Sequence, residues 1–193
     1  MRVLHFLNIP LGAEQLQTGG NAINSSGGWM AALLCSLRAV PDFDIGFAAF
    51  GDVSGFKAED CGGISSFRIP LKFDGTVRGL GVCAKIVEEW RPDLLHIHGT
   101  ENCFGLLTAR RLVRCPSLIS LQGLMGPYSE WRHFFGASTL WDVIKMHRWL
   151  EIPLLRGQCF GYRQFRRFAN REREIMAGNH CFMGRTDWDR SYL

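Results

Sequence analysis

The sequence lacks the features that define several large classes of protein. Its seven cysteines are an odd number and form no C-x-x-C pair, which argues against both a disulfide framework and a zinc knuckle. We therefore expect reduced thiols in a cytoplasmic protein. No run of apolar residues approaches the roughly 18 that a transmembrane helix needs. The first residues also lack the long apolar region and the small-residue cleavage site of a secretory signal.

Common catalytic and nucleotide-binding motifs are absent as well. The chain contains no G-x-x-x-x-G-K-[ST], no H-E-x-x-H and no G-x-S-x-G, so it offers no P-loop, no zincin helix and no nucleophile elbow. A G-x-G-x-x-A match at 79–84 falls inside a predicted helix rather than after a strand, which is the wrong context for binding a dinucleotide. The net charge of +4 is too small to indicate a nucleic-acid partner.

What the sequence does contain is an alternation of strand and helix patterns over 193 residues. Short apolar runs predict strands at 2–7, 45–50, 64–69, 94–97, 118–121 and 181–183, and helical periodicity predicts helices at 28–40, 76–91 and 104–113. Residues 51–63 are expected to form a loop. Because the strands are apolar on both faces, they indicate a parallel sheet covered by helices. We therefore predict one α/β domain over 1–193, with a Rossmann-like parallel sheet and helices on both faces.

Ligands of open parallel sheets bind at the carboxyl ends of the strands, so the residues there are candidates for a site. Gly27 and Gly28 lie just before the first predicted helix. Paired glycines let a phosphate approach the backbone closely, and a helix N-terminus favours an anion. The pair is therefore a candidate for binding a diphosphate, and the alternative is a tight turn with a serine N-cap.

Polar residues also follow the strand predicted at 94–97. His96 and His98 are two residues apart and share a face of the strand, and Glu101 follows in the loop. Two histidines make a poor metal site and no third ligand is close in the sequence, so no metal is expected. For His98 a functional and a structural role both stay open, whereas for His96 we expect a structural role. The alternative for Glu101 is stabilisation of a helix N-terminus.

Two more strand ends carry candidates. Gln122 and Gly123 directly follow the strand predicted at 118–121, and the amide of Gln122 can hydrogen-bond a sugar hydroxyl through both its oxygen and its nitrogen. Arg185 lies in a charged turn after the last predicted strand.

Three segments at these strand ends resemble the family 4 glycosyltransferases, and most closely their bacterial group-1 members, which are retaining enzymes of the GT-B fold. They are Gly-Gly-Trp at 27–29, His-Ile-His-Gly-Thr-Glu at 96–101 and Gly-Arg-Thr-Asp-Trp-Asp at 184–189. The resemblance spans the whole chain and identifies it with the N-terminal, acceptor-side half of such an enzyme.

The chain departs from the family pattern at two places. Gln122 takes the place where many members carry a histidine, and no two glutamates are eight residues apart, so the family's donor-binding motif is missing.

The resemblance implies transfer of a sugar, with retention, from a nucleoside-diphosphate sugar to a glycan or a lipid-linked acceptor. It implies no cofactor and no metal. Gly27 and Gly28 would lie near the donor diphosphate, and the acceptor side would be lined by His98, Glu101, Gln122 and Gly123. Arg185 would contact phosphate or the domain junction. The C-terminal donor-binding domain would be absent, which would leave the isolated chain inactive.

The segment at about 128–178 is predicted to be helical, basic and aromatic. Residues 128–175 hold 9 Lys/Arg and 5 Asp/Glu, against 13 and 13 in the rest of the chain. Apolar residues at helical spacing are Tyr162, Phe165, Phe168 and Ala169, and further aromatic residues are Trp131, Phe134, Phe135, Trp141 and Trp149. We expect 131–175 to meet an anionic membrane, at its inner face, or a lipid-linked acceptor. The alternative is that the aromatic residues pack onto the domain's own sheet.

Two other functions remain compatible with these patterns. The chain would bind a nucleotide by itself if it were a complete, flavodoxin-like protein. It would bind a membrane or an acceptor without catalysis if the basic segment were its working part.

Overall fold

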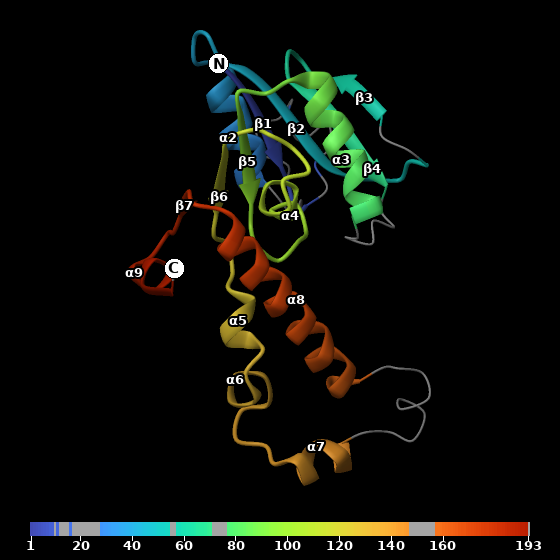
Figure 1. Cartoon of the computed structure of the whole chain (residues 1–193), viewed down its shortest axis with the longest axis vertical. Helices are drawn as coiled ribbons and strands as arrows, with labels where there is room; N and C mark the ends of the chain where they lie inside the picture. Colours follow the sequence, from blue (N-terminus) through green and yellow to red (C-terminus); the bar gives the residue numbers. More distant parts are fainter. Residues whose placement is uncertain are drawn as a thin grey trace.

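The computed structural model describes residues 1–9, 11, 16, 28–54, 57–70, 77–146 and 157–192. Within these residues seven strands form one sheet, in the order β3-β4-β2-β1-β5-β6-β7 (Figure 1). Their bounds are β1 Arg2–Phe6, β2 Asp44–Gly51, β3 Lys57–Asp60, β4 Ser65–Pro70, β5 Leu94–His98, β6 Ser117–Ser120 and β7 Phe182–Met183. All neighbouring strands are parallel except β3, which pairs with β4 in the antiparallel sense. The predicted α/β, Rossmann-like sheet is confirmed.

Helices cover both faces of this sheet, and its inner strands are largely buried on both sides. The helix α2 (Gly28–Arg38) packs on one face, where its Leu34 joins a core with Phe47 of β2. The helices α3 (Val77–Trp90) and α4 (Leu106–Ala109) pack on the other face, together with Ile175 of α8 (Gln158–Gly178). The inner strand β2 sends Ala48 into one core and Phe47 and Ala49 into the other.

The order of the strands locates the place where a ligand would bind. If the edge strand β3 is left aside, the sheet order is β4-β2-β1-β5-β6-β7, so the chain winds outward in one direction from β1 and in the other from β5. The connections after β1 and β5 consequently leave in opposite directions. The crevice at the carboxyl ends of two such strands is the usual binding place in doubly wound sheets.

Helices that follow β6 form an arm at the end of the sheet (Figure 1). The chain passes through α5 (Met125–Tyr128), α6 (Trp131–Phe135) and α7 (Leu140–Met146), and α8 returns toward the sheet. Glu172 of α8 connects the arm to the sheet, because its buried carboxylate accepts hydrogen bonds from the backbone N–H groups of Met125 and Gly126.

The structure corrects three local expectations. Residues 57–60, expected in a loop, form the edge strand β3. Their side chains are all exposed, so the apolar pattern used to predict strands is missing there. The charged turn expected after β7 is the helix α9 (Asp187–Tyr192). At its start the backbone N–H of Thr186 donates to the Asp189 carboxylate, and the backbone N–H of Asp189 donates to the Thr186 hydroxyl. The helix expected at 104–113 is regular only in α4.

Among the described residues, no helix is both long and apolar enough to cross a membrane.

Candidate functional site

Polar side chains from two strand-end loops meet where the strand order reverses. Asn8 follows β1, and its Nδ2 donates a hydrogen bond of 2.9 Å to Oε2 of Glu101, which follows β5. The amide oxygen Oδ1 of Asn8 is buried and has no hydrogen-bond partner among the described residues. Gly99, with φ +89°, lies against this pair, and a Cβ on it would overlap both the Glu101 carboxylate and the Asn8 amide. Only glycine leaves room for the pair.

Burial changes the acidity of the Glu101 carboxyl group. The loss of solvent raises its pKa, and the nearby charge of Glu172 raises it further, while Arg185 and the Asn8 hydrogen bond act in the opposite direction. The main-chain carbonyl of Glu101 also accepts a hydrogen bond from the guanidinium of Arg171 on α8. The carboxylate is therefore held in position by two strand-end loops and the arm, and its partly desolvated oxygens are strong hydrogen-bond acceptors.

The residues predicted after β6 and β7 lie beside Glu101. Gly123 is so close that a Cβ on it would lie 3.2 Å from Oε1 of Glu101. The backbone oxygen of Gln122 accepts a hydrogen bond of 2.5 Å from Nη2 of Arg185. The structure thus brings together Glu101, Gly123, Gln122 and Arg185, four of the residues selected from the sequence. Asn8 was not selected, since a lone polar residue before a proline carries no recognisable motif.

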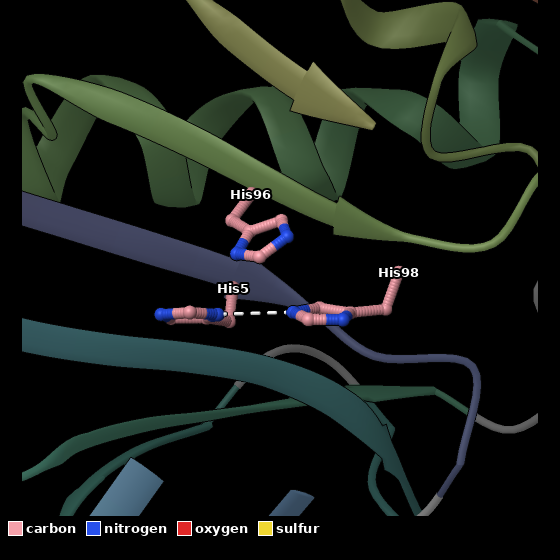
Figure 2. A group of neighbouring side chains, drawn as sticks. All are labelled: His5, His96 and His98. Atoms are coloured by element: carbon pink, nitrogen blue, oxygen red, sulfur yellow. Dashed lines mark hydrogen bonds between the residues drawn. The ribbon is translucent and has the colours of Figure 1, made fainter. Parts of the chain in front are cut away.

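His98 belongs to a different group, on the face of the sheet that α2 covers. Figure 2 shows its ring beside those of His5 and His96. The register pairs His5 of β1 with His96 of β5, and His98 lies two residues further along the same face. Nδ1 of His5 is 3.0 Å from Nε2 of His98, and Nε2 of His96 is 2.6 Å from Oγ of Ser120. His5 was missed in the sequence because nothing local reveals which strand neighbours β5.

The rings of His5 and His98 are held neutral by the sheet around them. His5 is 1% exposed and His98 is 2% exposed. Burial lowers the pKa of His5 to about 3 and that of His98 to about 2, and the neighbouring His96 adds to both effects. Burial also lowers the pKa of the half-buried His96. Three imidazoles therefore offer uncharged nitrogen lone pairs at neutral pH.

The hydrogen bond between His5 and His98 leaves one donor unpaired whichever tautomer is present. If Nδ1 of His5 donates, Nδ1 of His98 carries the other proton; if Nε2 of His98 donates, Nε2 of His5 carries it. Both of these outer nitrogens are buried without a partner among the described residues. An unpaired buried N–H costs about 1–3 kcal/mol, so this arrangement of the two rings lowers the stability of the fold.

The glycine pair predicted to bind phosphate is only partly described. Gly27 lies outside the described residues, and Gly28 is the first residue of α2. Trp29, the next residue, is 53% exposed and lies edge-on to the His98 ring, with 5.9 Å between the ring centroids. The start of α2 therefore lies over the histidine cluster, close to the end of β5.

The sequence of this chain was compared with protein-family models and with curated proteins, and nothing matched.

Proposed function

We propose that this chain is the acceptor-side half of a retaining glycosyltransferase, and that the Asn8–Glu101 pair binds a hydroxyl group of the acceptor. The observation that carries the proposal is the position of this pair. Its two members follow β1 and β5, the strands between which the sheet order reverses, and that crevice is where doubly wound sheets bind their ligands.

The chemistry of the pair suits a sugar. A sugar hydroxyl donates one hydrogen bond and accepts others, so it needs an acceptor and a donor side by side. Glu101 supplies carboxylate oxygens as acceptors, and the Asn8 amide nitrogen, which gives one N–H to Glu101, carries a second N–H as the donor. Partial burial strengthens such hydrogen bonds because less water competes for them. The resemblance of the strand-end segments to family 4 glycosyltransferases supports the same substrate class.

The donor side of the proposal depends on the start of α2. The resemblance implies that the diphosphate of a nucleoside-diphosphate sugar lies near Gly27 and Gly28, where backbone N–H groups at a helix N-terminus would stabilise the leaving group. Arg185, with its guanidinium at the Gln122 carbonyl, would supply positive charge or hold the second domain. The sugar would then pass to a glycan or a lipid-linked acceptor with retention of configuration.

Saturation-transfer NMR on the purified chain tests this proposal. Octyl glucoside, octyl galactoside and octyl mannoside serve as acceptor probes, with UDP, GDP and flavin mononucleotide as separate probes. We expect at least one glycoside to bind wild type and to lose most of its signal with Glu101→Gln. Glu174→Gln is the matched control, because Glu174 is exposed on α8 and pairs with Arg110. Tight binding of a nucleotide, with no glycoside response, would instead support a self-contained nucleotide-binding protein.

A second candidate function, docking on an anionic membrane, is favoured by the surface of the arm. The helix α7 exposes large apolar side chains on its outer side while Val143 is fully buried. Their exposed fractions are Leu140 60%, Trp141 70%, Ile144 50% and Met146 53%. On α8, Phe160, Arg163 and Arg167 line a pocket. Apolar side chains next to arginines are suited to the interface of an anionic bilayer.

The part of the arm that meets solvent differs from the sequence-based expectation. Tyr162 and Phe165 of α8 pack against the rings of α6, with centroids 5.5 Å and 5.3 Å from that of Phe134. These aromatic contacts therefore pack α8 against α6 within the arm. Trp149 and the rest of 147–156 lie outside the described residues. The membrane proposal consequently rests on α7 and on the exposed arginines of α8.

A further inference from the structure

We propose that His5, His96 and His98 bind a divalent transition-metal ion such as Zn²⁺, and that a water molecule or a ligand oxygen completes its coordination. The inference uses neither member of the Asn8–Glu101 pair, and it concerns the face of the sheet beneath α2. It rests on two observations: the convergence of the three rings, whose ligand nitrogens lie within 4.8 Å of one another, and the hydrogen bond between His96 and Ser120.

The geometry is close to that of a metal site. One ligand nitrogen from each histidine lies within 4.8 Å of the other two. Zinc–nitrogen bonds of about 2.0–2.1 Å in a tetrahedral site place two ligand nitrogens roughly 3.3 Å apart. The 3.0 Å separation between His5 Nδ1 and His98 Nε2 is already near that value. The other separations, which are at most 4.8 Å, must shorten by up to about 1.5 Å to reach it.

The positions of the three ligands are fixed by the sheet. His5 and His96 are register partners on β1 and β5, and His98 is on the same strand as His96. Metal sites carried by strands keep their geometry better than sites on loops.

A hydrogen bond to Ser120 completes the arrangement around His96. Its Nε2 lies 2.6 Å from the Ser120 hydroxyl oxygen, so Nδ1 is the nitrogen that faces a metal. Metal-binding histidines commonly donate their second N–H to an oxygen in this way, which sets both the tautomer and the orientation of the ring. Ser120 on β6 is therefore a positioning residue for the site.

The ligand set indicates which ions would bind. Imidazole nitrogen suits Zn²⁺, Cu²⁺, Ni²⁺ and Co²⁺ better than Mg²⁺ or Ca²⁺, which prefer oxygen. Three neutral ligands leave the charge of the ion uncompensated, which favours an anionic fourth ligand such as hydroxide or carboxylate. Three histidines with one open position is an arrangement found in catalytic zinc sites.

Cobalt spectroscopy on the whole 193-residue chain tests the site. The protein is treated with a chelator, desalted and titrated with Co²⁺, whose d–d absorption is intense in four-coordinate sites and weak in octahedral ones. We expect one equivalent to bind with intense bands, and Zn²⁺ to displace it with the same stoichiometry. His5→Gln, His96→Gln and His98→Gln should each weaken binding at least about 100-fold, and Ser120→Ala should weaken it by about 10–100-fold.

Exposed histidines provide the matched controls. His133 and His180 are exposed and lie far along the chain from the cluster, so His133→Gln and His180→Gln should keep both the bands and the affinity. Absence of stoichiometric binding by the wild-type chain would overturn the proposal. Binding that survives replacement of all three cluster histidines would also overturn it. Circular dichroism of each variant identifies those that fail to fold, and the wild-type titration decides the question without them.

Discussion

The carboxylate of Glu172 on α8 accepts a hydrogen bond of 2.5 Å from the hydroxyl of Thr100, although 72 residues separate them. The same carboxylate accepts hydrogen bonds from the backbone N–H groups of Met125 at 3.0 Å and Gly126 at 2.8 Å. One fully buried side chain thus connects the loop after β5, the start of α5 and the returning helix of the arm. It holds the arm next to the crevice that contains Glu101.

Replacing Glu172 by alanine should therefore destabilise the protein strongly. The change leaves the backbone N–H groups of Met125 and Gly126 without their acceptor in a buried place, while the Thr100 hydroxyl keeps only the Gly123 carbonyl. We expect a loss of about 3–5 kcal/mol in the free energy of unfolding. Glu174→Ala is the control on the same helix. Its exposed ion pair with Arg110 should contribute at most about 1 kcal/mol. Urea denaturation of both variants measures the difference, and equal losses would contradict this interpretation.

Gly99→Ala should abolish glycoside binding. Any Cβ at this position overlaps the Glu101 carboxylate and the Asn8 amide, so the pair would have to separate. Gly63→Ala provides a control with the same backbone requirement, because Gly63 has φ +83° but a Cβ there meets nothing within 4 Å. Both variants carry the strain of a positive φ, about 1–3 kcal/mol. If the two bind octyl glycosides equally well, the Asn8–Glu101 pair is not the acceptor site.

The metal-free protein should lose stability as the pH falls below 6.5. The pKa values of His5 and His98 are about 3 and about 2 in the fold, against 6.5 when exposed. The unfolded chain therefore takes up protons first, and stability that is complete above pH 6.5 is lost toward pH 3. Each pH unit in this window costs up to about 1.4 kcal/mol per histidine. Unfolding by urea at a series of pH values measures the slope.

A variant without the two titrating rings should flatten this profile. His5→Leu combined with His98→Leu removes the groups that bind protons on unfolding, so the free energy of unfolding should change less between pH 6.5 and pH 4. His133→Gln, at an exposed position, should leave the wild-type slope in place. The explanation fails if the double variant is as sensitive to acid as wild type.

Most of the sheet could be predicted from the sequence because its strands are buried on both faces. Such strands appear as short apolar runs, and β1, β2, β4, β5 and β6 all do so. The strand β3 does not, since it pairs through its backbone alone and all four side chains are exposed. The helix α9 could have been predicted, because Thr186 and Asp189 have the spacing of a capping box.

The candidate site was only partly predictable for a different reason. Glu101, Gly123 and Arg185 were found because each follows a strand, and parallel strands end at one edge. His5 could not be connected with His98, because their contact depends on β1 and β5 being neighbours with a particular register. Glu172 was equally hidden. It lies in a strongly basic stretch where the pattern indicates a solvated face, yet it is fully buried.

The arm should attach weakly to anionic membranes through α7 and the arginines of α8. Phosphatidylglycerol vesicles should co-sediment with the chain at low salt and release it at high salt, while phosphatidylcholine vesicles should retain little. Each cation near an anionic surface contributes about 1 kcal/mol, so replacing Arg163, Arg166 and Arg167 together by glutamine should weaken binding roughly 100-fold.

Trp141→Ala should weaken binding to these vesicles as well, because this side chain is 70% exposed on the arm. Trp188→Ala is the matched control, since Trp188 is 56% exposed but lies on α9. Equal effects of the two tryptophan changes, or no binding at low salt, would show that the arm is not a membrane-docking surface.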